Sequence, residues 1–151
     1  MAELDYSQLE LRVASWLAGD ENMQHAYQSG SDLHSKTTEL LFGDTSGLSH
    51  EEQKRRRTQS KSANFGFLYG MVAKTFIAYA KGYGLDLTQE DSEKIRADFF
   101  NAYPTLLTWH EECKDYARTY GYIKSPIGRK RWFKNIHSNN FALRSADERQ
   151  A

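Results

Sequence analysis

Residues 57–70 read Arg57-Thr-Gln-Ser-Lys61-Ser-Ala-Asn64-Phe65-Gly66-Phe67-Leu68-Tyr69-Gly70. At about 100° per residue, a helix would place four of these side chains on one face: Arg57, Lys61, Asn64 and Phe65. Tyr69 would follow Lys61 by about 12 Å along the helix axis, a length comparable with a nucleotide. This spacing favours a nucleotide-binding face. Arg57 and Lys61 would bind phosphates, Phe65 would lie against sugar or base, and Tyr69 would reach the base.

The same motif has a purely structural interpretation. A basic amphipathic helix would bury Phe65, Leu68 and Tyr69 in the core, while Gly66 and Gly70 would allow close packing of a neighbouring element. The pattern of residues 57–70 alone leaves both interpretations open.

The composition indicates one globular domain in a reducing compartment. A chain of 151 residues can bury roughly two thirds of its unfolded surface. Its single cysteine, Cys113, cannot form an internal disulfide. Since no stretch of the sequence is long and apolar enough to enter a membrane, we expect a cytoplasmic protein without membrane contact.

The net charge of zero conceals two segments of opposite charge. Residues 1–53 hold ten acidic and two basic residues, and the remainder carries a net charge of plus eight. No acidic residue occurs in residues 53–85 or in residues 116–146, and aromatic residues alternate with basic ones in both stretches. This pattern favours binding of a phosphate backbone and stacked bases. A solvated charged face over a core is the simpler alternative.

Hydrophobic spacing and capping residues predict an α+β fold that is predominantly α-helical, with a short β-hairpin. Ser7 with Glu10, and Ser49 with Glu52, have the spacing of capping boxes, and Asp32 can cap a helix. Strands 122–124 and 131–133 would enclose the turn 125–128. We expect helices at about 8–18, 32–42, 49–65 or beyond, 73–81, 88–102 and 104–120, and one from about 139 that is still helical at Ala151, as in a cut chain.

Two further motifs are candidate sites. In Asp5-Tyr6-Ser7-Gln8-Leu9-Glu10-Leu11-Arg12, a carboxylate at a helix entry could bind a hard cation next to a phosphate. Its simpler role is that of a helix cap. Gly128-Arg129-Lys130-Arg131 could contact phosphate, although basic residues at a hairpin edge commonly serve only to prevent aggregation.

These motifs, with Asp32-Leu33-His34 between them, resemble family A DNA polymerases, the group of bacterial DNA polymerase I and its phage relatives. The resemblance covers essentially the whole chain. It implies the fingers subdomain and part of the palm of a right-hand polymerase fold, as a single partial domain 1–151. The palm metal-aspartate motif would occupy residues 1–20, the fingers about 21–120, and a return toward the palm about 121–151.

The resemblance also implies roles for individual residues. Asp5 would bind two Mg²⁺ ions together with the Tyr6 carbonyl, and Lys61 would protonate pyrophosphate. Glu10 would exclude a ribose 2′-hydroxyl and hold Tyr69 beside the template base. The remaining contacts would be to dNTP and to primer-template DNA: His34, Arg57, Lys61 and Phe65 for the nucleotide, and Arg129, Arg131 and Arg149 for the DNA backbone.

One family feature is missing from these 151 residues. The third motif, a hairpin with His-Asp-Glu that supplies the second metal-binding aspartate, is absent; His50-Glu51-Glu52 and His110-Glu111-Glu112 fall within predicted helices. We therefore expect a fragment or a split subunit that needs the missing palm and thumb and is inactive alone. The alternatives are a non-catalytic DNA-binding or accessory module and a single-subunit RNA polymerase fragment, although Phe65 and Glu10 favour deoxynucleotides.

Overall fold

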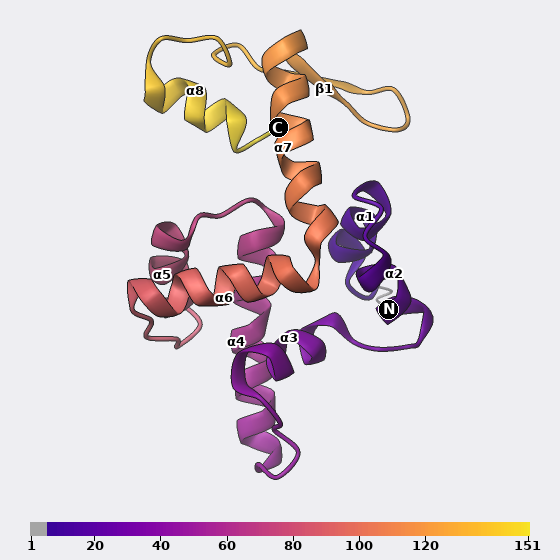
Figure 1. The fold of residues 1–151 in the computed structure, drawn as a ribbon, viewed down its shortest axis with the longest axis vertical. Coiled ribbons are helices and arrows are strands. Elements are labelled where there is room, and N and C mark those ends of the chain that lie inside the picture. The colour runs from indigo at the N-terminus through magenta and orange to yellow at the C-terminus, as the bar shows by residue number, and fades with distance from the viewer. Residues whose placement is uncertain (1–5) are drawn as a thin grey trace, which may run out of the picture. The chain divides into compact units, whose positions relative to one another are not determined.

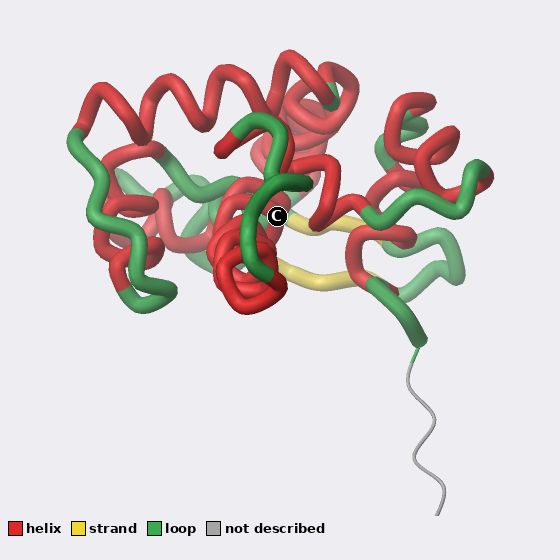
Figure 2. Tube along the Cα trace, turned by 90° about the horizontal axis from the view of Figure 1, so that it is seen from below, coloured by secondary structure: helices red, strands yellow, loops and turns green. Residues whose placement is uncertain are grey.

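The computed structural model describes residues 6–151, and its predominantly helical architecture confirms the predicted fold class (Figures 1 and 2). The chain divides after Leu106 into unit 1 and unit 2. The elements are α1 (Leu9–Leu17), α2 (Glu21–Gln28), α3 (Leu33–Phe42), α4 (His50–Leu68), α5 (Ala73–Lys81), α6 (Gln89–Ala102), α7 (Pro104–Tyr120), β1 (Tyr122–Lys124), β2 (Lys130–Trp132) and α8 (Phe141–Glu148).

The core of unit 1 forms around α4, against which α3, α5 and α6 pack (Figure 1). Phe67 of α4 is fully buried. Its ring centroid lies 4.5 Å from that of Phe76, 5.3 Å from Phe99 and 6.1 Å from Phe100. These aromatic contacts join three helices and hold the remaining face of α4 toward α3 and solvent.

Local signals explain where α4 begins and ends. The Ser49 hydroxyl accepts a hydrogen bond from the Glu52 N–H at 3.3 Å, while the Glu52 carboxylate pairs with Arg55 and Arg56. The expected capping box therefore forms on one side only. At the other end, the Met71 N–H donates to the Gly66 carbonyl and the Gly70 N–H to the Phe67 carbonyl, a Schellman motif.

The two glycines of the motif have different roles. A Cβ on Gly66 would lie 3.1 Å from the Phe76 ring, so Gly66 allows α5 to approach closely, as predicted. Gly70 has a φ of +71° with nothing within 4 Å of a Cβ. Close packing, which the structural interpretation offered for both glycines, therefore does not apply to Gly70, which instead supplies the left-handed conformation that ends the helix.

The start of α1 differs from the prediction. Gln8 is its N-cap residue, with a φ of 54°, and no side chain caps the helix, so the Ser7–Glu10 capping box is wrong. The Gln8 side chain instead donates to Asp32 and accepts from the Tyr27 hydroxyl. The Arg12 guanidinium donates to the Ser7 carbonyl at 2.9 Å. Contacts with other parts of unit 1 thus replace the local cap.

Helix α2 was not predicted. Asp20, 1% exposed, caps it by accepting from the Met23 N–H at 3.0 Å. The same carboxylate accepts from the Thr105 hydroxyl at 2.7 Å. The signal for this helix in the sequence was Asp20 as a possible cap, followed by the apolar residues Met23 and Ala26 at helical spacing. Both of these residues are buried in the structure.

In unit 2, a small core joins α7 to the hairpin and to the segment that follows it. Ala117, Phe133 and Ile136 are buried and pack with Ile123 and Ala151. The strands pair in antiparallel register, Tyr122 with Trp132 and Lys124 with Lys130, so β2 begins one residue earlier than predicted. Asn140 caps α8, which ends at Glu148, so the prediction that the helix continues to Ala151 is wrong.

None of the helices in residues 6–151 has the length and apolar character that a membrane crossing requires.

Candidate nucleotide site

The predicted face of α4 is present in unit 1. Arg57, Lys61 and Phe65 are each partly exposed, one helical turn apart, and Asn64 is buried beside them. Tyr69, the residue after the helix, is 64% exposed. The core interpretation is therefore wrong for Tyr69, although it holds for Leu68, which is 6% exposed. A cationic and aromatic row thus remains accessible along the helix.

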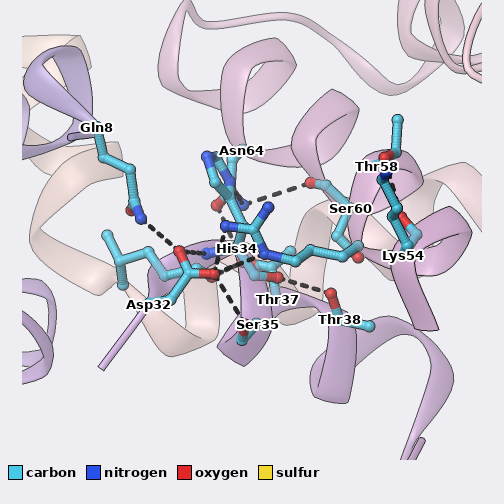
Figure 3. A network of polar contacts seen from close by, with 12 residues as sticks. Gln8, Asp32, His34, Ser35, Thr37, Thr38, Lys54, Thr58, Ser60 and Asn64 are labelled. Atoms are coloured by element: carbon cyan, nitrogen blue, oxygen red, sulfur yellow. Dashed lines mark hydrogen bonds and ion pairs between the residues drawn. The ribbon is translucent and has the colours of Figure 1, made fainter. Parts of the chain in front are cut away.

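Asp32 is the central acceptor of the site, as Figure 3 shows for its contacts with Gln8, His34 and Ser35. It caps α3 by accepting from the His34 N–H at 3.2 Å and from the Ser35 hydroxyl at 2.8 Å. Its Oδ2 also lies 2.8 Å from Arg57 Nε and 2.7 Å from Arg57 Nη2. One carboxylate thus links the start of α1, the start of α3 and the cationic face of α4.

Asp32 remains ionised at neutral pH. Burial by itself would raise the pKa of its carboxyl, but hydrogen bonds from Ser35 and Arg57, the Arg57 charge and the His34 N–H together lower it. Sequence reasoning identified Asp32 as a cap and did not detect its pairing with Arg57, because the partners are 25 residues apart.

His34 lies in the first turn of α3 and is only 4% exposed. Asn64 Nδ2 lies 2.9 Å from His34 Nδ1, and the Asn64 Oδ1 accepts from the Thr37 hydroxyl at 2.9 Å. Since an amide nitrogen only donates, Nδ1 is the acceptor and the neutral ring carries its proton on Nε2. The imidazole also packs on Phe65, with ring centroids 5.7 Å apart.

The surroundings of His34, above all its burial, favour the neutral form of the ring. Burial is the largest cause that lowers its pKa to about 4; the Asp32 charge opposes this shift, and the Arg57 and Lys61 charges add to it. Arg57 and Lys61 are one helical turn apart on α4, and Arg57 pairs with Asp32, the cap of the helix that carries His34. An anion bound among them would raise the pKa of His34 by stabilising the imidazolium.

Two predicted partners, Glu10 and Tyr69, do not contact each other through a hydrogen bond. Glu10 is exposed on the first turn of α1, and Tyr69 is exposed beyond the end of α4. Within residues 6–151, no hydrogen bond connects these two side chains. The structure therefore brings together His34, Arg57, Lys61 and Phe65 with Asn64, which sequence reasoning placed on the same helical face without a role. Asp32 joins them as a residue that sequence reasoning identified only as a helix cap.

The predicted metal ligands fall at the start of the chain. Asp5 lies outside the described residues, and Tyr6, the first described residue, is 78% exposed. In residues 6–151 there is no group of three or more His, Cys, Asp or Glu side chains suited to a metal ion. His50-Glu51-Glu52 and His110-Glu111-Glu112 lie within α4 and α7, as predicted.

The predicted DNA contacts are exposed in unit 2. Arg129 follows the hairpin turn, where its N–H donates to the Ser125 hydroxyl at 3.1 Å. Arg131 of β2 donates to Gln150, and Arg149 donates to the Ser145 hydroxyl at 2.8 Å. The contact with Gln150 brings the hairpin next to the end of α8, where Arg149 is located.

Comparison with known proteins explains this combination of motifs. The family model described as DNA polymerase family A matches residues 1–151. This chain belongs to DNA polymerase family A. The resemblance drawn from the sequence motifs is thereby confirmed.

Individual relatives agree with the family. The chain is 35% identical over 147 residues to the thermostable DNA polymerase I of Thermus filiformis, and 32% identical over 151 residues to that of Thermus aquaticus. These matches cover 97% and 100% of this chain but 17% of each relative. This family A segment therefore spans about a sixth of the length of these relatives.

A solved structure has the same fold. The polymerase domain of Pol1 from M. smegmatis, in complex with DNA primer-template and dNTP, matches with a TM-score of 0.81 at 26% identity. The match covers 97% of this chain and 24% of that one.

Proposed function

We propose that this family A segment binds the incoming dNTP on α4 and forms part of a DNA-directed DNA polymerase. The observation that carries the proposal is the accessible row of Arg57, Lys61 and Phe65 with neutral His34 packed beside it. The dNTP and primer-template DNA named for the M. smegmatis structure support the choice of ligands. The segment would comprise palm residues 1–20, fingers at about 21–120 and a return toward the palm at about 121–151.

Each side chain has a chemical role in this proposal. Arg57 and Lys61 bind the triphosphate, and His34 donates to it through Nε2. The triphosphate competes with Asp32 for the Arg57 guanidinium. Phe65 packs on sugar and base, and Lys61 gives a proton to the departing pyrophosphate.

The exposed residues at either end of the site complete the nucleotide contacts. Tyr69 borders the template base, and Glu10 excludes a 2′-hydroxyl and holds Tyr69 once the nucleotide is in place. Arg129, Arg131 and Arg149 bind the DNA backbone through their exposed guanidinium groups.

Magnesium fits the donor atoms at the start of the chain. A carboxylate at Asp5 and a backbone carbonyl at Tyr6 are hard oxygen ligands of the kind that Mg²⁺ prefers. Two bound ions would activate the primer 3′-hydroxyl and neutralise the triphosphate and the leaving pyrophosphate. A single carboxylate is too few to hold both ions, so we propose that another part of the polymerase supplies a second one.

Helix α1 supports contact with the rest of the polymerase. Leu9, Val13 and Trp16 recur at helical spacing and are 47%, 44% and 64% exposed. An apolar stripe of this kind is typical of a face that another element covers. We propose that the remaining palm packs here, which the greater length of the relatives supports.

We expect nucleotide binding to raise the pKa of His34. In the free protein it is about 4, and a triphosphate beside the ring should raise it by about one unit or more. The measurement is an NMR titration of the imidazole signals with and without saturating dATP. The spectra span about pH 8 to 3.5 and so include the pKa of the free protein. Because stability falls between about pH 6.5 and 4, where only the unfolded chain takes up the proton, circular dichroism checks folding at each pH.

His34→Gln assigns the relevant signal, and the exposed residue His137 serves as the control in the same spectra. An unchanged His34 titration at saturating dATP would contradict its phosphate contact. A matching response of His137 would indicate binding without a specific site.

The purified chain should show little or no primer extension by itself. Its residues provide one of the two carboxylates that the proposed chemistry requires. The assay combines the chain with matched primer-template, Mg²⁺ and all four dNTPs, and uses an intact family A polymerase as the positive control. Robust synthesis that disappears in Asp5→Ala would overturn the proposal that another part must complete the site.

A further inference from the structure

The hairpin of unit 2 has two faces of different chemistry. Because alternate strand residues point to opposite sides, the register places Tyr122 with Lys124 on one face of β1, and Trp132 with Lys130 on the same face of β2. Ile123 packs on the other face, against the small core of unit 2. The outward face therefore carries two aromatic rings and two lysines.

Helix α7 extends this face with two further rings. The Tyr116 and Tyr120 centroids lie 4.4 Å apart, and Tyr122 is 5.8 Å from Tyr116 and 6.3 Å from Tyr120. Tyr122 is in turn 4.8 Å from Trp132. We call the set of six side chains the aromatic–lysine surface: Tyr116, Tyr120, Tyr122, Trp132, Lys124 and Lys130.

The rings of this surface are not part of the core. Tyr116 is 38%, Tyr120 56% and Trp132 64% exposed. Contiguous exposed aromatic side chains commonly mark a binding surface, whereas single exposed apolar residues are normal on any protein. The second acid-free stretch of the sequence, residues 116–146, contains all six side chains.

The lysines give the surface a positive charge. Lys130 Nζ lies 4.2 Å from the centroid of Tyr122 and 5.6 Å from that of Trp132. The pKa of the Tyr122 hydroxyl is lowered, chiefly by a hydrogen bond from Tyr116 and next by the interaction with Lys130. In the described part of the chain, neither Lys124 nor Lys130 forms an ion pair, and the adjacent acid Asp115 is paired with Arg118. The two ammonium groups are therefore available to an anionic ligand.

We propose that the aromatic–lysine surface binds single-stranded template DNA. Bases would stack on Trp132 and Tyr120, while Lys124 and Lys130 would contact the phosphates between them. Every base has a flat face, so the surface would accept any template sequence, as copying requires. DNA as the ligand rests on the proposed function, and the predicted backbone contact Arg129 lies next to the turn of the same hairpin.

The test measures fluorescence anisotropy of a labelled oligo(dT) of about 16 nucleotides titrated with the full chain. Trp132→Leu and Tyr120→Leu should each weaken binding about tenfold, and Trp132→Phe should keep most of the affinity. Lys130→Gln should make the dependence of log affinity on log salt shallower by about 0.7. Trp16→Leu is the matched control, since Trp16 is also 64% exposed but lies in unit 1.

A blunt DNA hairpin and oligo(rU) are the comparison ligands, and circular dichroism checks that each variant is folded. Equal affinity of Trp132→Leu and the unmodified chain for oligo(dT) would overturn the proposal, as would absence of binding by the unmodified chain. An equal loss on the blunt hairpin, or tighter binding of oligo(rU), would contradict single-stranded DNA as the ligand. The assay contains no dNTP or Mg²⁺, so failure of the nucleotide site on α4 would leave its result unaffected.

Discussion

Phe67→Ala should destabilise unit 1 by about 3–5 kcal/mol, a large part of the total stability of a typical domain. Phe67 is fully buried and its ring contacts Phe76, Phe99 and Phe100. Removal of the ring loses the free energy gained by transferring it from water to the core. It also leaves a cavity that the surrounding helices cannot fill completely. The change is measured as the shift of the urea midpoint, followed by far-UV circular dichroism.

Phe141→Ala is the matched control, because this phenylalanine is 70% exposed on α8. It should leave the urea transition of unit 1 unchanged. Phe67→Leu keeps most of the buried volume and should cost less than Phe67→Ala, about 1.5 kcal/mol or below. Equal midpoints for the two alanine variants would show that the aromatic cluster does not determine the stability of unit 1.

Much of the fold could be predicted because its signals are local. Pro104 begins α7 and Thr88 caps α6 through a complete capping box, both of which depend on residues within one helical turn. The same reasoning failed at Ser7, where a possible cap exists in the sequence but Gln8 is held by Asp32 and Tyr27. Tertiary contacts thus override a local preference that is worth only about 1 kcal/mol.

The site was predictable in part for the same reason. Helical spacing placed Arg57, Lys61 and Phe65 in one row without any knowledge of the rest of the chain. The pairing of Arg57 with Asp32 and the contact of Asn64 with His34 join residues 25 and 30 positions apart. Such contacts depend on how α3 packs on α4, which no local pattern specifies.

Burial of His34 has a functional consequence that the sequence could not reveal. A histidine next to a helix N-terminus would be expected at the surface, whereas His34 is buried and its pKa is lowered to about 4. The neutral ring adds no positive charge beside Arg57 and Lys61, which limits repulsion among the three side chains. A nucleotide that raises the pKa by about one unit leaves the ring neutral at pH 7, so His34 contributes a hydrogen bond from Nε2 while the two cations contribute the charge.

Arg57→Ala and Lys61→Ala should each weaken binding of dATP about ten- to hundredfold. Each change removes a charge-assisted hydrogen bond to phosphate, worth about 1.5–3 kcal/mol. The loss should fall toward the lower end for Arg57, because its pairing with Asp32 at 2.7 Å has to be given up when the nucleotide binds. Isothermal titration of the full chain with dATP measures the affinity, and thermal unfolding checks that each variant remains folded.

Arg55→Ala separates phosphate binding from the loss of a helix charge. Arg55 lies on the same helix and is paired with Glu52 at 2.8 Å, as Arg57 is paired with Asp32 at 2.7 Å. Both changes therefore remove one arginine and one ion pair of α4, although Glu52 keeps its pair with Arg56, and Arg55 belongs to a different face of the helix. A similar loss of affinity in both variants would mean that general positive charge attracts the nucleotide. A loss confined to Arg57→Ala and Lys61→Ala requires a phosphate site on the face beside His34, since only there do these side chains meet.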